Sequence, residues 1–116
     1  MSNLVDKQAL LDRVDGDLEF LEETVELLES DGRSLVEQLK AASAAGDQEG
    51  LVSKAHMLKG MVSNFCADSV QRAAEEIEHA ARSGQLDGMP PKVEGFIELF
   101  DCLCRETRAM LPGEGV

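Results

Sequence analysis

Four residues in the segment 51–67 combine side-chain types that could carry out group transfer. They are His56, Lys59, Gly60 and Ser63, separated by three, one and three positions. Histidine supplies a titratable nucleophile, lysine a cation, glycine a gap in the surface and serine a hydroxyl. The set predicts a polar strip on which an exposed imidazole could take up an anionic group.

The strip lies on a predicted helix whose other side is apolar. Its seam residues recur at intervals of four, three, four and three positions: Leu51, Ala55, Leu58, Val62 and Phe65. This spacing is typical of a helix packed into a bundle. At about 100° per residue, the seam side chains point within roughly 40° of one direction. His56 lies about 140° from the seam, Lys59 about 80°, Gly60 about 180° and Ser63 about 120°.

The remaining chain predicts further helices around this central one. Asp6 and Asp47 are expected N-caps, and Gly46 is an expected helix stop. Together with apolar periodicity, these signals predict helices at 4–14, 17–44, 48–64, 68–83 and from Pro90 or Pro91 to about Met110. Gly32 interrupts the helix propensity of 17–44 at a cost of about 1 kcal/mol, marking either a bend or a split. We favour a single helix because the apolar seam stays in phase across it.

Short connections between long helices make neighbours antiparallel. We therefore expect an all-α fold, an up-down antiparallel four-helix bundle with a short N-terminal capping helix. Residues 1–116 should form a single domain, with a frayed tail at 112–116. On the last helix we expect Val93, Phe96, Ile97, Phe100, Leu103, Cys104 and Thr107 to point inward.

Composition narrows the classes of function. The net charge of −12, from 11 basic against 23 acidic side chains, argues against nucleic acid and anionic membrane surfaces as partners. No apolar run approaches a membrane span of about 20 residues, and the first residues lack signal-peptide architecture. Cys66, Cys102 and Cys104 have no paired spacing and are expected to be reduced, structural thiols. We expect a cytoplasmic protein.

Glu78 is the candidate partner of His56 from the following helix. It lies about 100° from Ile77, at the edge of the predicted helix interface. A carboxylate there could accept a hydrogen bond from His56 Nδ1–H, leaving the Nε2 lone pair as a nucleophile. From these residues alone, an ordinary surface charge is an equally good interpretation of Glu78.

The segment Ala55-His56-Met57-Leu58-Lys59-Gly60, with Asn64, Ala67 and the Ile77–Glu78 pair, closely resembles histidine phosphotransfer (HPt) domains. The resemblance implies a four-helix bundle that carries a phosphoryl group between aspartates of receiver domains. It implies that His56 is the phosphoacceptor through Nε2 and that Lys59 steadies the phosphoryl oxygens. It also implies that Gly60 keeps the approach open and that Glu78 contacts the histidine. Two positions depart from the family pattern: Cys66 replaces a common glycine and Met61 a common small residue.

The same resemblance implies a phosphocarrier without kinase activity of its own. Its partners would be receiver domains of response regulators, of hybrid histidine kinases, or of both. We expect no cofactor or metal of its own, since Mg²⁺ should be held by the receiver's carboxylates. We expect a monomer. The docking surface should be an apolar patch around the imidazole, with Val52, Met57, Met61, Gly60 and Ser63 as candidates. Ordinary bundle contact is an equal alternative for Met57 and Met61.

Three alternatives remain open from the sequence. The chain could be a helical adaptor whose histidine is never phosphorylated. It could bind a metal through His56, Glu78 and His79, although helical angles place His79 opposite its own seam. It could also be a segment of a larger hybrid kinase, although Met1 and the predicted frayed tail favour a free-standing protein.

Overall fold

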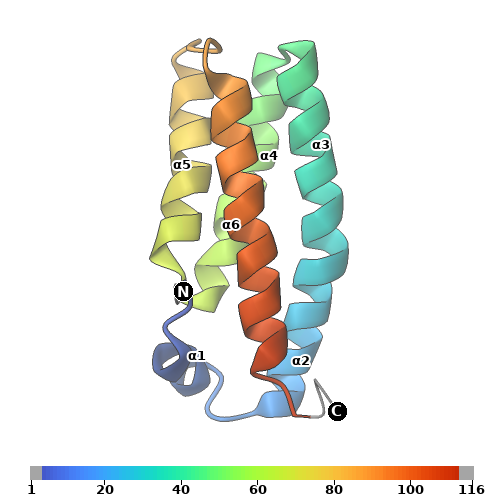
Figure 1. Cartoon of the computed structure of the whole chain (residues 1–116), viewed down its shortest axis with the longest axis vertical. Coiled ribbons are helices and arrows are strands. Elements are labelled where there is room, and N and C mark those ends of the chain that lie inside the picture. Colours follow the sequence, from blue (N-terminus) through green and yellow to red (C-terminus); the bar gives the residue numbers. More distant parts are fainter. Residues whose placement is uncertain (1–3, 113–116) are drawn as a thin grey trace.

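The computed structural model describes residues 4–112, and every regular element in them is helical. In chain order the helices are α1 (Lys7–Arg13), α2 (Leu18–Leu27), α3 (Arg33–Ala45), α4 (Gln48–Val62), α5 (Asp68–Arg82) and α6 (Met89–Ala109). Figure 1 shows the long helices side by side, with the short helix α1 at one end of the bundle. The predicted up-down four-helix bundle with a short capping helix is confirmed. Of the frayed tail predicted at 112–116, residues 113–116 lie outside the described residues.

The first rod is continuous from α2 through a π-helical turn, Leu28–Gly32, into α3. The predicted single helix is therefore confirmed. It widens to a π-helical turn at the place where the sequence showed only the low helix propensity of Gly32. Gly32 is buried, and a Cβ there would lie 2.8 Å from Phe100 Cζ and 3.1 Å from Met61 Sδ. Close approach of α6 and α4 is thus the reason for this glycine.

Aspartates and one glycine fix the helix ends. The carboxylates of Asp6, Asp17 and Asp47 each accept a hydrogen bond from the backbone N–H three residues on. Such N-caps satisfy donors that the first helical turn leaves free. Gly46, at φ 65°, ends α3 in the left-handed conformation, and Asp47 starts α4 immediately. This tight turn makes α3 and α4 antiparallel.

The core is built from the predicted seams. Leu51, Ala55, Leu58, Val62 and Phe65 are each at most 1% exposed. On α6 the predicted inward residues are buried except Ile97, which is half-buried. The start of α6 also differs from the prediction: the helix begins at the buried Met89, and Pro90 and Pro91 lie within its first turn. Proline fits there because the first N–H groups have no intrahelical partner.

The connection from α4 to α5 contains a non-glycine residue in the left-handed conformation. A short 3₁₀ turn, Ser63–Phe65, leads into Cys66, which adopts the left-handed conformation at φ 54° and ψ 47°. Glycine is the residue that this conformation favours, and Cys66 stands where the pattern that the sequence resembles commonly has glycine. The Cys66 carbonyl accepts the Asp6 N–H at 2.9 Å, tying the leading segment to this turn.

Two glycines inside helices, Gly32 and Gly95, allow a direct test of what a missing side chain does for packing. We expect Gly32→Ala to lower the free energy of unfolding by about 1–2 kcal/mol, because overpacking against Phe100 outweighs the better helix propensity of alanine. Gly95→Ala on α6 is the matched control, since its Cβ would meet nothing within 4 Å. That variant should be more stable than the parent by up to about 1 kcal/mol. Urea unfolding measures both changes, and equal effects would contradict the packing argument.

Candidate functional site

His56 lies in the middle of α4 with its ring facing outward. Its side chain is 61% exposed, while Ala55 and Leu58 beside it are fully buried and anchor the helix. His56 Nδ1 lies 3.1 Å from Glu78 Oε2 on α5. An ionised carboxylate only accepts hydrogen bonds, so this contact assigns the proton of a neutral ring to Nδ1 and the lone pair to Nε2. The structure thus brings together the two residues that the sequence suggested as partners.

Glu78 is surrounded by cationic groups. Its side chain is 8% exposed, and Oε1 forms an ion pair with Lys59 Nζ at 2.9 Å. Oε2 accepts hydrogen bonds from Arg82 Nη2 at 2.7 Å and Nε at 3.2 Å, besides facing His56. The sequence placed Glu78 at an interface edge, whereas it is a buried anchor that joins α4 to α5. Its carboxylate holds the imidazole and two cations at one place.

These contacts decide the charge of Glu78. Burial on its own would raise the pKa of this carboxyl, but hydrogen bonds from Arg82, Lys59 and His56 outweigh it and lower the pKa to about 2. Glu78 is therefore ionised at neutral pH. A charged carboxylate this deep in a helix interface is stable only while its partners remain in place.

Arg82 was missed by the sequence analysis. It lies one turn beyond Glu78 on α5, and its side chain is 59% exposed. The spacing of Glu78 and Arg82, at i and i+4 on one helix, was the available signal because such pairs commonly meet. Lys59 was predicted from the sequence, yet in the structure its ammonium is paired with Glu78 and is only 26% exposed.

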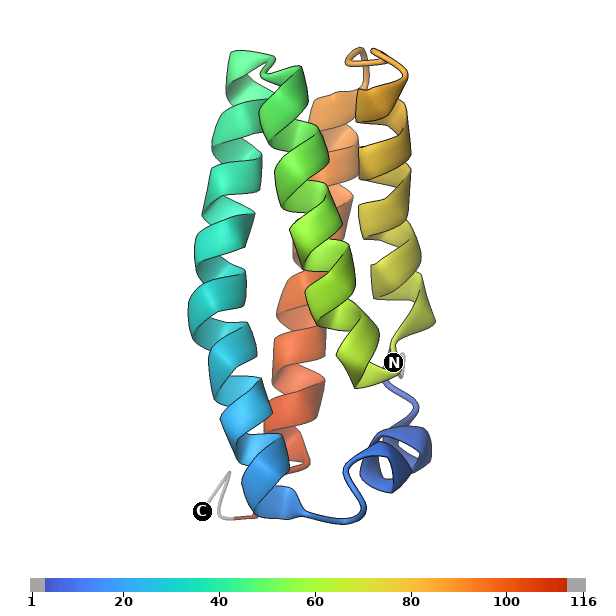
Figure 2. The same ribbon diagram turned by 180° about the vertical axis from the view of Figure 1, so that it is seen from behind.

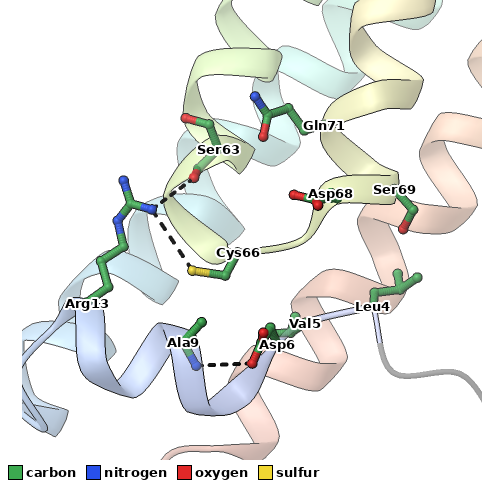
Figure 3. A pocket seen from close by; sticks show the side chains of 10 residues that line it. All are labelled: Leu4, Val5, Asp6, Ala9, Arg13, Ser63, Cys66, Asp68, Ser69 and Gln71. Atoms are coloured by element: carbon green, nitrogen blue, oxygen red, sulfur yellow. Dashed lines mark hydrogen bonds between the residues drawn. The ribbon is translucent and has the colours of Figure 1, made fainter.

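Gly60 and Ser63 differ in their surroundings. A Cβ at Gly60 would meet nothing within 4 Å, so the fold itself does not require glycine there. Ser63 Oγ donates a hydrogen bond to the Gly60 carbonyl at 2.6 Å. Figure 3 shows Ser63 lining a hollow between α1 and the α4–α5 turn, where Arg13 Nη1 bonds its carbonyl at 3.5 Å. The predicted strip thus has open space at Gly60, whereas the Ser63 hydroxyl is already hydrogen-bonded to the backbone at the end of α4.

The predicted docking residues differ in how exposed they are. Met57 is 49% exposed, whereas Val52 and Met61 are half-buried. Met61 Sδ lies against Gly32, so this side chain packs toward the neighbouring rod. Of the two interpretations left open for Met61, the structure supports bundle contact.

Two exposed apolar residues on α2 were not predicted. Phe20 is 53% and Leu27 57% exposed, and together with Met57 they are the large exposed hydrophobic side chains within residues 4–112. Phe20 also lines a cavity of about 290 Å³ that reaches Asn64, just beyond the end of α4. Both residues lie outside the α2 seam. They are seven positions apart and so share one side of the helix, which was the signal in the sequence for an exposed apolar strip. Figure 2 shows α2 and α4 on the same face of the bundle.

The arrangement does not favour a metal site at His56. No group of three or more His, Cys, Asp or Glu side chains that could hold a metal ion occurs among the described residues. His79, the third candidate ligand, lines a separate hollow with Gln85 and Lys92. Across the same part of the chain, no helix is both long enough and apolar enough to cross a membrane.

Comparison with known proteins identifies the family. The model of the Hpt domain family matches residues 19–111, from α2 to just beyond α6, and the chain therefore belongs to the Hpt domain family. Hpt domains are phosphocarriers that take part in histidine phosphotransfer and interact with receiver domains. Searches of curated proteins and of solved structures returned no match.

The depressed pKa of Glu78 predicts how stability depends on pH. Its folded value, about 2, lies below the ordinary value of 4.5, so ionised Glu78 stabilises the fold above about pH 4.5 and this contribution is lost as the pH falls toward 2. We expect the parent's advantage in unfolding free energy over Glu78→Gln to shrink across this range. Urea unfolding at a series of pH values measures it, with the exposed Glu75→Gln as control. A difference in unfolding free energy that stays constant from pH 4.5 to 2 would contradict the lowered pKa of Glu78.

Proposed function

We propose that this chain is a phosphorelay carrier in which His56 Nε2 accepts a phosphoryl group from an aspartyl phosphate of a receiver domain and later returns it to another. The observation that carries the proposal is the exposed imidazole whose Nδ1 is held by the buried carboxylate of Glu78 at 3.1 Å. Orientation of the ring by a fixed acceptor is what a nucleophilic nitrogen needs.

The step balances without a further reactant. The Nε2 lone pair attacks phosphorus as the bond to the aspartyl oxygen breaks, and that oxygen keeps the electron pair. The proton stays on Nδ1, facing Glu78. Phosphoryl transfer depends mainly on positioning and on neutralising charge. Lys59 and Arg82, both in contact with Glu78, are the cations placed to meet the phosphoryl oxygens. Mg²⁺ would be supplied by the receiver.

The docking surface we propose is the outer side of α4. Gly60 gives an approach without side-chain bulk, and Met57 adds exposed apolar area beside the imidazole. Phe20 and Leu27, on α2, are the other large exposed apolar side chains of the described residues and offer a second contact area to the same partner. The small size of such a patch suits a transient encounter. We propose a monomeric cytoplasmic protein whose 116 residues act as one domain.

Labelled phosphate from receiver domains tests the central claim. A panel of phosphorylated receivers should label the parent chain, and His56→Gln should abolish the label because it removes the accepting nitrogen. His79→Gln is the matched control, since His79 is the other histidine of the chain and is exposed on α5. Label that persists in His56→Gln would overturn the assignment. Failure of every receiver to label the parent would favour the helical-adaptor alternative.

Gly60 provides a test that separates docking from folding. Both Gly60→Ala and Gly95→Ala add a methyl group in open space on a helix, so both should raise stability by up to about 1 kcal/mol. Only Gly60→Ala should slow transfer from a receiver, by roughly tenfold, because the methyl group lies on the approach to His56. Single-turnover transfer rates measure the difference. Equal rates for the two variants would mean that the partner does not approach over Gly60.

A further inference from the structure

The carboxylate of Glu78 engages the same two cations that a phosphoryl group on His56 would need. Lys59 Nζ lies 2.9 Å from Oε1, and Arg82 Nη2 lies 2.7 Å from Oε2. His56 Nδ1 faces that same Oε2 at 3.1 Å. Because all three groups contact one carboxylate, both cations lie beside the imidazole. In the unphosphorylated protein their charge is therefore already partly neutralised.

Phosphorylation places a second anion at this cluster. Charge-assisted hydrogen bonds are short and directional, so an ammonium or guanidinium group turned toward phosphoryl oxygens must give up contact with Glu78. The exposed fractions allow this movement, since Arg82 is 59% and Lys59 26% exposed, whereas Glu78, at 8%, is fixed in the interface. The two anions thus compete for the same donors.

We propose that Glu78 is a positioning residue that also acts as an internal counter-ion, competing with the phosphoryl group for Lys59 and Arg82. The inference rests on the proposed function and deepens it. Competition weakens the hold of the site on the phosphoryl group, so that the group passes readily to the next aspartate. The imidazole keeps its Nδ1 proton and its acceptor throughout, and the bonds that form and break are the Nε2–P and aspartyl O–P bonds.

Glu78→Gln isolates this effect. A glutamine oxygen can still accept the Nδ1–H hydrogen bond, but a neutral amide no longer neutralises the two cations. Titration with inorganic phosphate, followed by NMR of the His56 ring, needs no phosphorylation. We expect Glu78→Gln to bind phosphate roughly three- to tenfold more tightly than the parent, the size of one partly exposed charge interaction. Glu75→Gln, an exposed residue of the same helix, removes equal charge and should leave binding unchanged.

A double-mutant cycle tests whether the gain acts through the cations. In an Arg82→Gln background, the gain from Glu78→Gln should shrink, because one of the two released cations is absent. An undiminished gain would overturn the proposal. So would weaker or unchanged binding by Glu78→Gln, an equal gain in Glu75→Gln, or no phosphate binding by any of the variants. Should Glu78→Gln not fold, Glu78→Asp must give a smaller gain in the same direction, because its shorter carboxylate withdraws from both cations.

A second readout connects the competition to transfer. At equilibrium with a receiver, the phosphorylated share should rise in Glu78→Gln and stay unchanged in Glu75→Gln. This arm requires the relay function, whereas the phosphate titration does not. A chain that no receiver labels, but whose Glu78→Gln variant binds phosphate more tightly, would refute the relay and uphold the competition. A chain that receivers label, but whose Glu78→Gln variant binds phosphate no more tightly than the parent, would uphold the relay and refute the competition.

Discussion

The site depends on one buried negative charge. The Glu78 carboxylate lies in the interface of α4 and α5, where it holds the ring of His56, the ammonium of Lys59 and the guanidinium of Arg82. An isolated carboxylate at this depth would be costly, and its three partners remove that cost. The same contacts therefore join two helices, set the tautomer of the imidazole and bring two cations beside it. Stability and chemistry share these atoms, so a change at Glu78 affects both.

Most of the fold could be predicted from the sequence because its signals are local. The three-and-four spacing of the seams, the aspartate N-caps and Gly46 each act over one or two helical turns. What could not be predicted depends on contacts between distant segments. Gly32 is an example: its weak helix propensity is visible in the sequence, but its cause is Phe100, 68 positions further on. The start of α6 is another, since the burial of Met89 is a tertiary feature.

In the candidate site, too, local features could be predicted and contacts between helices could not. Helical spacing placed His56 and Gly60 on the outer side of α4, and the angle from Ile77 brought Glu78 near the interface. Periodicity gives the direction of a side chain but not its partner, so the pairing of Lys59 with Glu78 was not foreseen. Arg82 and Glu78 follow a local i, i+4 rule and could have been found. Phe20 and Leu27 lie off the α2 seam, and the spacing of apolar residues alone does not show whether such a side chain is exposed or is covered by a neighbouring helix.

The π-helical turn at Leu28–Gly32 has a consequence for how such a chain tolerates changes in length. A π-helical turn holds more residues than a regular turn, so it absorbs an additional residue while α3 keeps its place in the bundle. Deleting one residue there would restore an unbroken α-helix with α2 and α3 in phase, because the residue removed is the one that the wide turn had absorbed. Phe20 and Leu27 would then keep their direction, and the α4–α5 interface with His56 would stay as it is. The same deletion in a regular turn of this rod would instead rotate α2 about its axis by about 100° and carry its exposed apolar side chains to another face.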